Sequence, residues 1–446
     1  MNAKTILAVA ALPFAAGCLS NVADFRDTVA EAKQSVFPSL VYISVVSESG
    51  SDGKIEKTQG SGSGVIASEK GEVLTNHHVI DRAARIRCQL TDGSSYEAKV
   101  VGSDKDLDVA LLQLQAPEGT KFPAAKLTER KPEVGEVVLA MGAPWGLARS
   151  VSMGIVSCND RYLENCGDYT LWYQTDAAIS PGNSGGPLVD THGYVVGLNA
   201  RGNTRGAQGF TIPSPIILQV LPNLREYGDA HWAWLGIDWQ PLRDFSKEAF
   251  FDAPDGVIVA GTDPQGPARA AGLEPNDRVI AVDGRSVTAK FREDIPALNR
   301  SLALSGWDRP LRLDYVRGSV TNSVAVKPAA KGATQGREAE FKRWGLTAKD
   351  INRFETPDLA FQAPDGGVYV SSLAWEGNAD SAGFKRRDII RKWDGQDVKS
   401  VDDLEKIYKA AVADVARKSR ANVDILRGGR PARIVIDYRN DPEKDD

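Results

Sequence analysis

The sequence predicts a mainly β protein in which a domain of two β-barrels is followed by two copies of a smaller α+β domain. Between residues 36 and 226, short apolar runs such as 41–46 and 193–197 alternate with turns rich in Gly, Ser, Asp and Asn, a pattern typical of barrels and sandwiches. In the C-terminal half, Ala253-Pro254-Asp255-Gly256 recurs as Ala363-Pro364-Asp365-Gly366. A repeat of roughly 100 residues indicates tandem domains, because solenoid repeats are much shorter.

Composition excludes several other classes of protein. The 446 residues are 42% apolar and 25% charged, with a formal net charge of −5. The strongly basic character of a nucleic-acid-binding protein is absent, so we expect no nucleic-acid partner. Four cysteines are too few for a disulfide scaffold of this length. No apolar run approaches the roughly 20 residues that a membrane-spanning helix needs.

The first residues have the pattern of an export signal. Lys4 supplies a positive charge, residues 6–16 are apolar, and the run ends at Ala15-Ala16-Gly17-Cys18. Small residues before a cysteine suit a lipoprotein signal peptidase, so we predict a lipoprotein-type signal peptide over 1–18 and a lipid on Cys18. An ordinary secretory signal cut at small residues is the alternative.

The lipid would anchor the protein to a membrane surface without spanning the membrane. Leu19 after the cysteine favours the outer membrane of a bacterial envelope, with the protein on its periplasmic side. Shifts in composition predict the remaining boundaries: a tether over 19–35, the two-barrel domain over 36–226, the first repeat over 232–328, a linker over 329–338, the second repeat over 339–440, and a disordered tail over 441–446.

Three motifs contain side chains that suit acyl transfer. His77 and His78 follow an apolar run, an acidic turn over 104–108 enters a second run, and a glycine-dense loop surrounds Ser184. A serine hydroxyl becomes a nucleophile when a neutral imidazole takes its proton and a carboxylate orients that imidazole. Because the chain has only four histidines, few residues can be the general base.

The glycines around the serine predict an oxyanion hole. They let the backbone turn so that N–H groups of Gly182, Asn183 and Ser184, those of Gly182 and Ser184 above all, converge on a developing oxyanion. The stretch Gly60-Ser61-Gly62-Ser63-Gly64 lacks the Gly-Lys-Ser/Thr of a phosphate loop, so we interpret it as close strand packing.

Three motifs in this order, Thr-Asn-x-His-Val, Asp-Val-Ala-Leu-Leu and Gly-Asn-Ser-Gly-Gly-Pro-Leu, followed by two repeats, resemble the HtrA (DegP/DegQ-like) family. Members are trypsin-like serine endoproteases with carboxy-terminal PDZ domains. The resemblance covers about residues 35–440 and implies a chymotrypsin-like double β-barrel followed by two PDZ domains, which are partly open α+β barrels. It assigns the base to His78, the orienting acid to Asp108 and the nucleophile to Ser184, in the chain order of chymotrypsin.

The resemblance also implies a substrate pocket near Ala178 and Phe210. Ala178 stands six residues before the nucleophile, where an acidic residue would select Lys or Arg. Small or medium aliphatic P1 residues are therefore expected. We expect no cofactor and no metal, since Cys158 and Cys166 have no second pair of ligands.

Cys158 and Cys166 bracket a predicted surface loop, and we expect a disulfide between them in an oxidising periplasm; two unpaired thiols are the alternative. Cys88, inside a strand-like run, is expected to be a buried free thiol.

Each repeat resembles a PDZ domain, which binds a peptide's carboxyl end as an added strand. Leu235, Gly236 and Ile237 would form the carboxylate-binding loop of the first domain, and residues 344–346 that of the second. Since the first loop keeps the family's Leu-Gly pattern better, we assign peptide capture to the first domain, with assembly as the main role of the second. The alternative is that both domains are inert spacers.

The sequence therefore predicts an envelope serine endopeptidase that degrades unfolded or damaged proteins. The competing interpretation is a proteolytically latent PDZ chaperone or peptide-binding protein. Expected partners are unfolded polypeptides, C-terminal peptides and further copies of the chain, as a homotrimer or larger homo-oligomer. The resemblance implies trimers formed through the protease domains by aromatic residues near their start, for which Phe37 and Tyr42 are candidates.

Overall fold

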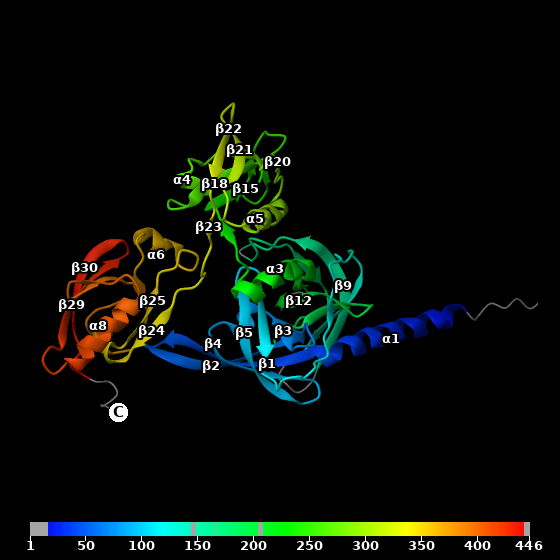
Figure 1. Ribbon diagram of the computed structural model, residues 1–446, viewed down its shortest axis with the longest axis horizontal. Coiled ribbons are helices and arrows are strands. Elements are labelled where there is room, and N and C mark those ends of the chain that lie inside the picture. Colours follow the sequence, from blue (N-terminus) through cyan, green and yellow to red (C-terminus); the bar gives the residue numbers. More distant parts are fainter. Residues whose placement is uncertain (1–16, 144–148, 165, 204–207, 441–446) are drawn as a thin grey trace, which may run out of the picture.

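A computed structural model describes residues 17–143, 149–164, 166–203 and 208–440. The chain forms an N-terminal helix, a two-barrel domain, a middle domain and a C-terminal domain (Figure 1). The mainly β, double-barrel fold is as predicted. The predicted tail over 441–446 lies outside the described residues, as does the predicted signal sequence apart from the backbone of residues 17 and 18.

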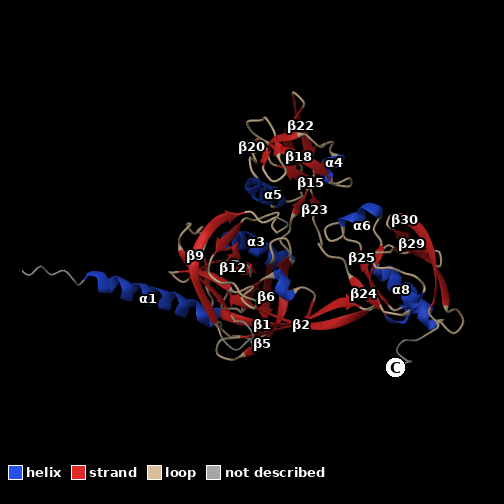
Figure 2. Ribbon diagram, turned by 180° about the vertical axis from the view of Figure 1, so that it is seen from behind, coloured by secondary structure: helices blue, strands red, loops and turns tan. Residues whose placement is uncertain are grey.

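The predicted tether is helical. Helix α1 (Gly17–Val36) projects from the two-barrel domain in both overall views (Figures 1 and 2). Its last turns are held to the domain because Ala32 and Val36 are buried in the domain core. Among helices of the described part of the chain, none is long and apolar enough to cross a membrane.

The first barrel is closed in the order β1-β2-β3-β6-β5-β4. Its strands are β1 (Leu40–Ser51), β2 (Lys54–Ile66), β3 (Glu72–Thr75), β4 (Ala83–Gln89), β5 (Ser95–Asp104) and β6 (Val109–Leu114). The short helix α2 (His77–Ile80) follows β3 directly. Strands β1 and β2 extend beyond the barrel as a hairpin that reaches the C-terminal domain (Figure 1).

The second barrel also closes, because β11 pairs with both β8 and β12. Its strands are β8 (Val137–Gly142), β9 (Ser150–Arg161), β10 (Trp172–Thr175), β11 (Pro187–Asp190), β12 (Tyr194–Asn203) and β13 (Gln208–Pro213), with β7 (Lys126–Leu127) added beside β12. Helix α3 (Ser214–Tyr227) follows β13 at the end of the two-barrel domain.

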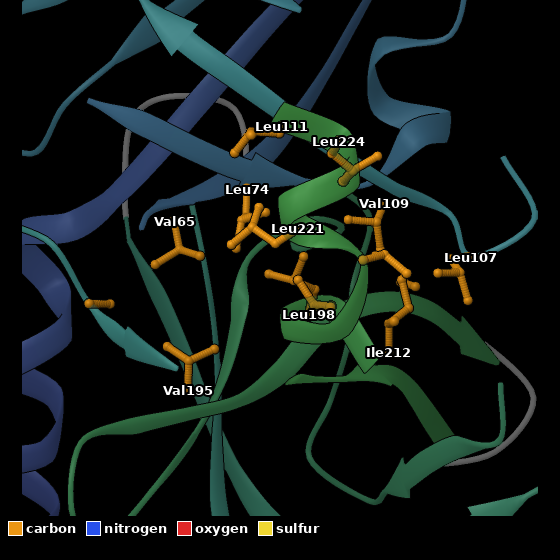
Figure 3. Close-up of a cluster of buried hydrophobic side chains, with 14 of the residues drawn as sticks. Val65, Leu74, Leu107, Val109, Leu111, Val195, Leu198, Ile212, Leu221 and Leu224 are labelled. Carbon is orange, nitrogen blue, oxygen red and sulfur yellow. The ribbon is translucent and has the colours of Figure 1, made fainter. Parts of the chain in front are cut away.

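One core joins the two barrels and α3 (Figure 3). Leu74 and Leu111 come from the first barrel, Leu198 from the second, and Leu221 and Leu224 from α3. This shared core fixes the two barrels relative to each other, which matters because the candidate catalytic residues come from both.

The middle and C-terminal domains contain similar elements. The middle domain has the strand order β15-β18-β19-β21-β22, formed by β15 (Ile237–Gln240), β18 (Val257–Thr262), β19 (Arg278–Val282), β21 (Leu311–Arg317) and β22 (Val320–Val326). Its small strands are β14 (Ala233–Trp234), β16 (Arg243–Asp244), β17 (Ala249–Phe250), β20 (Arg285–Ser286) and β23 (Ala329–Ala330), and its helices are α4 (Pro267–Ala270) and α5 (Ile295–Ala303).

The C-terminal domain has the strand order β24-β25-β26-β27-β29-β30, formed by β24 (Glu338–Phe341), β25 (Leu346–Asp350), β26 (Val368–Leu373), β27 (Ile389–Trp393), β29 (Arg420–Arg427) and β30 (Arg430–Asp437), with β28 (Gln396–Asp397) beside β27. Its helices are α6 (Pro357–Gln362), α7 (Asn378–Ser381) and α8 (Val401–Ala413). It therefore has one strand, β24, that the middle domain's sheet lacks.

The predicted linker is ordered at both ends. Strand β23 pairs with β14 of the middle domain, and Glu338 begins β24. Between them, the Lys331 ammonium group donates hydrogen bonds to the Asp106 carboxylate and to the Tyr169 hydroxyl of the two-barrel domain. The linker therefore connects all three domains.

Candidate active site

Two antiparallel strands bring His78 and Asp108 together. Thr75 at the end of β3 lies opposite Ala110 at the start of β6. The residues that follow β3 and those that precede β6 therefore meet at one end of the first barrel. His78 lies in α2 just after β3, and Asp108 lies immediately before β6.

The Asp108 carboxylate holds the His78 ring. The His78 Nδ1 atom lies 2.7 Å from Asp108 Oδ2 and 3.0 Å from Oδ1, and the His78 backbone N–H donates to Oδ1 at 2.9 Å. Asn76 Nδ2 donates to the Asp108 carbonyl at 3.0 Å. Asp108 is buried and has a φ of 58°, in the left-handed region that non-glycine residues rarely adopt. Local strain of this kind is characteristic of functional sites.

His77 makes no comparable contact. Both of its ring nitrogens are buried without a hydrogen-bond partner in the described part of the chain, and its Nε2 atom lies 3.7 Å from Asp81 Oδ1. Burial lowers its pKa, which favours the neutral ring. Of the two adjacent histidines, the structure joins only His78 to Asp108.

The loop that carries Ser184 connects β10 to β11 and lies against β2 and β3. The Ser63 N–H donates to the Ser184 carbonyl at 2.8 Å. Gly185 has a φ of 82°, and a Cβ atom there would approach the Ser63 carbonyl to 2.2 Å and Thr75 Oγ1 to 2.3 Å. Only glycine fits this contact, which places the serine beside the barrel that carries His78 and Asp108.

The Ser184 hydroxyl donates to the Ala200 carbonyl at 3.2 Å. Among the described residues, no hydrogen bond joins it to His78. Proton transfer to the imidazole would therefore require the hydroxyl to turn away from Ala200. Such bonds are often absent without substrate and form in the substrate complex.

Two backbone N–H groups of this loop are unused. Within the described hydrogen bonds, those of Gly182 and Ser184 have no acceptor, as an oxyanion hole requires. The Asn183 N–H donates to the Ser180 carbonyl at 3.0 Å. A turn therefore uses the Asn183 N–H in this structure, and its part in the oxyanion hole stays a prediction.

The comparisons with known proteins agree with this geometry. Residues 62–198 match the trypsin-like peptidase domain family, and residues 233–327 match the PDZ domain family. A probable periplasmic serine endoprotease of Pseudomonas putida (strain W619), described as DegP-like, is 33% identical over 394 residues, which cover 85% of this chain and 79% of the relative. The chain belongs to the HtrA (DegP-like) family of serine endoproteases.

Other HtrA-family proteins give the same result. A protein of the same description from Halomonas elongata is 34% identical over 399 residues, covering 87% of this chain and 81% of the relative. The solved structure of the HtrA-type protease AlgW with a decapeptide superposes with a TM-score of 0.58 at 28% identity, over 68% of this chain and 98% of AlgW. The serine endoprotease of Yersinia pestis has a TM-score of 0.53 at 28% identity, over 68% of this chain and 97% of that protein. This HtrA-family chain is thus a serine endopeptidase with a PDZ domain.

Ser63 is a site residue that the sequence analysis missed. Its buried hydroxyl donates to the Gly182 carbonyl at 2.6 Å and accepts from the Ala143 N–H at 2.8 Å. The surrounding glycines do pack closely, as interpreted: a Cβ atom at Gly62 would lie 2.7 Å from the Val79 methyl groups. The one signal in the sequence was a serine between glycines, because such close packing brings its hydroxyl next to another segment of the chain.

The predicted pocket residues both belong to the second barrel. Ala178 is exposed after β10, and Phe210 is half-buried on β13, opposite Gln174 of β10. The aliphatic P1 preference of this HtrA-family protease stays a prediction.

The predicted disulfide is not formed in the structure, where Cys158 and Cys166 are free thiols. Cys158 lies within β9 and its partner across the β9–β10 hairpin is Gln174. Cys166 lies in the following loop and packs against the core near Trp172, whose indole N–H donates to the Cys166 carbonyl. The structure therefore does not contain the predicted disulfide. Cys88 is a buried free thiol, as predicted, and burial raises its pKa to about 12.

In the PDZ domain, the predicted loop of Leu235, Gly236 and Ile237 leads into β15. Strand β15 pairs only with β18 within the described residues, so its other edge is open. A cavity of about 380 Å³ lies along that edge, lined by the loop, by β15 and by Ile295, Asn299 and Leu302 of α5. Tyr162, Asp168 and Tyr169 of the two-barrel domain also line this cavity. An open strand edge beside a helix is the geometry of strand addition.

Proposed function

We propose that Ser184, His78 and Asp108 are the catalytic triad of this endopeptidase. Ser184 attacks the peptide carbonyl, His78 accepts the serine proton and later gives it to the leaving amine, and Asp108 orients the imidazole. The observation that carries the proposal is the two-point contact between Asp108 and His78, which uses the backbone N–H as well as the ring.

The oxyanion would be stabilised by the N–H groups of Gly182 and Ser184. Removing one such donor typically costs about 10²–10³ in turnover. Ser63 supports this arrangement, because its hydrogen bond to the Gly182 carbonyl fixes the next peptide unit of the same loop.

The proposed substrates are unfolded or damaged proteins of the cell envelope, cleaved after small or medium aliphatic residues. Ala178 has no charged group that could pair with a P1 lysine or arginine. Two of the relatives described above are named as periplasmic, which supports the same compartment for this chain. Within it, we propose lipidation at Cys18, attachment to the outer membrane and assembly into trimers or larger homo-oligomers.

The loop of Leu235, Gly236 and Ile237 is proposed to bind peptide C-termini. The C-terminal domain is proposed to be a second PDZ domain, and an ion pair between an arginine and a buried aspartate, present in both domains, supports this. In the middle domain, Arg317 bonds the buried Asp277 carboxylate and the Gly272 carbonyl. In the C-terminal domain, Arg427 bonds the buried Asp388 carboxylate and the Gly383 carbonyl in the same way.

Hydrolysis of unfolded casein tests the proposal. Residues 19–446 should cleave casein, and Ser184→Ala should abolish cleavage. Ser94→Ala, in a surface turn of the first barrel, is the matched control and should cleave like the parent. Full activity of Ser184→Ala would refute the assignment of the nucleophile. If no form cleaves casein yet all bind unfolded peptides, the latent peptide-binding protein becomes the better description.

A further inference from the structure

The C-terminal domain differs from the middle domain at one sheet edge. In the middle domain no described strand pairs with the edge of β15 next to α5, whereas the corresponding edge of β25 is paired with β24 along its length. The pairing is antiparallel, from Glu338 opposite Lys349 to Phe341 opposite Leu346. Strand β24 therefore lies where an added peptide strand would lie.

The inner face of β24 fills the groove between β25 and α8. Ala339 and Phe341 belong to the buried core of the domain. The Phe341 ring meets the Tyr408 ring of α8 edge to face, with centroids 5.4 Å apart. Just before the strand, Arg337 forms ion pairs of 2.6 Å with Asp402 and with Glu405 of α8. The segment thus contacts both walls of the groove.

The direction of β24 also matches that of a bound peptide. Peptides that add to a PDZ domain run antiparallel to the strand, with their carboxyl end at the glycine-containing loop. Phe341, the last residue of β24, lies next to the loop that contains Gly345. In this chain the backbone continues into that loop where a free peptide would end.

We propose that β24 is a ligand held in cis by the C-terminal domain, so that free peptide C-termini bind at the β15 edge of the middle domain and not at the β25 edge. The inference rests on the proposal that both domains are PDZ domains. A segment tethered so closely has an effective concentration of about 1 mM. For a groove that binds the free strand at about 10 μM, it weakens competing peptides about 100-fold.

The outer face of β24 contacts the β1–β2 hairpin of the two-barrel domain. The N–H groups of Gly50 and Ile55, in the β1–β2 hairpin, donate to the carboxylates of Glu338 and Glu340 at 3.4 and 3.1 Å. Arg82, after α2, lies 3.6 Å from Glu338. Figures 1 and 2 show the hairpin reaching this strand from the barrel. The strand therefore holds the hairpin and the C-terminal domain together.

The proposal is tested by measuring backbone hydrogen exchange with and without a peptide. The protein used comprises residues 19–446 and carries Ser184→Ala, so that it does not cleave the peptide. The probe is the fluorescent peptide Arg-Glu-Ala-Glu-Phe with a free carboxyl terminus, which has the sequence of residues 337–341. In the parent, saturating peptide should leave the exchange of residues 346–350 unchanged. Peptide-induced protection of residues 346–350 in the parent would overturn the proposal.

A variant supplies the complementary measurement. Ala339→Asp puts a charge into the groove and should speed exchange of residues 338–341, while giving the peptide an affinity at the β25 edge about 100-fold above the parent's. Val435→Asp, at an exposed position of β30, is the control and should bind like the parent. If Ala339→Asp keeps β26 to β30 protected yet binds no peptide, the proposal fails. If it unfolds the domain, the parent measurement decides alone.

Exchange of the middle domain tests the peptide-capture proposal separately from the inference about β24. Peptides that fail to protect residues 237–240 would contradict the peptide-capture proposal made for the β15 edge. Protection of residues 346–350 in the parent would contradict only the inference about β24.

Discussion

The Ser63 hydroxyl donates a hydrogen bond of 2.6 Å to the Gly182 carbonyl, and the two residues lie in different barrels. The same hydroxyl accepts from the Ala143 N–H, while the Ser63 backbone donates to the Ser184 carbonyl. One residue of β2 thereby fixes the loop that carries both the proposed nucleophile and the proposed oxyanion-hole donors.

Ser63→Ala should lower kcat about 10- to 100-fold with little change in KM, because a loop displaced by a fraction of an ångström misplaces the N–H groups of Gly182 and Ser184. The unpaired Ala143 N–H and Gly182 carbonyl should also cost about 1–3 kcal/mol of stability. Steady-state kinetics on a peptide substrate measures the first effect and urea unfolding the second. Ser61→Ala, exposed on the same strand, is the control. Unchanged kcat in a folded Ser63→Ala protein would refute the positioning role.

Asp108→Asn should lower kcat about 10³- to 10⁴-fold, because the neutral amide does not stabilise the imidazolium and can hold the His78 ring in the wrong tautomer. Casein cleavage and circular dichroism measure activity and folding. Asp106→Asn changes a carboxylate in the same turn that contacts Lys331 and not His78. A loss confined to Asp108→Asn supports the assignment, whereas equal losses in both variants would attribute the effect to the turn.

Asp104 predicts a pH dependence of stability. Burial, and next the Asp106 carboxylate, raise its pKa from 3.8 to about 7, against the hydrogen bonds from the Leu107 and Trp232 N–H groups and the attraction of Lys331. Since the native state binds a proton that the unfolded chain releases, this contribution to stability is complete below pH 4 and is lost as the pH rises to about 7.

Asp104→Asn should remove that component, so the difference in unfolding free energy between parent and variant should change between pH 4 and 7 and stay constant above. Urea unfolding at several pH values measures the difference. A pH-independent difference would show that Asp104 ionises normally in the folded protein.

The thiols should differ in reactivity. Because burial raises the pKa of Cys88 to about 12, native residues 19–446 at pH 8 should react with Ellman's reagent at the half-buried Cys158 and Cys166, and at Cys88 only in denaturant. Cys88→Ser should lose the thiol that reacts only in denaturant, which would identify that thiol as Cys88. Absence of any reactive thiol in the native protein would instead support a bond between Cys158 and Cys166.

The sequence was informative where the chemistry is local. His78 next to Val79, Asp108 before an apolar strand and Ser184 among glycines each lie in a short motif, and the double-barrel domain followed from regular strands and turns. Contacts between distant segments were not predictable. The Ser63 and Gly182 partners are 119 positions apart.

The C-terminal domain illustrates the same limit. The repeat predicted similar elements, but which strand covers the edge of β25 depends on packing against α8 rather than on the pattern of residues 338–341. The disulfide prediction failed for a related reason. The spacing of Cys158 and Cys166 suggested a clamped loop, whereas the register of β9 and β10 sets Cys158 opposite Gln174.

The central claim is that Ser184 is a nucleophile activated by His78, and a fluorophosphonate probe tests it most directly. Residues 19–446 should acquire one adduct, and mass spectrometry of the digested protein should locate it on Ser184. His78→Ala should acquire none under the same conditions while remaining folded. An adduct on another serine, or equal labelling of His78→Ala, would contradict the proposed active site.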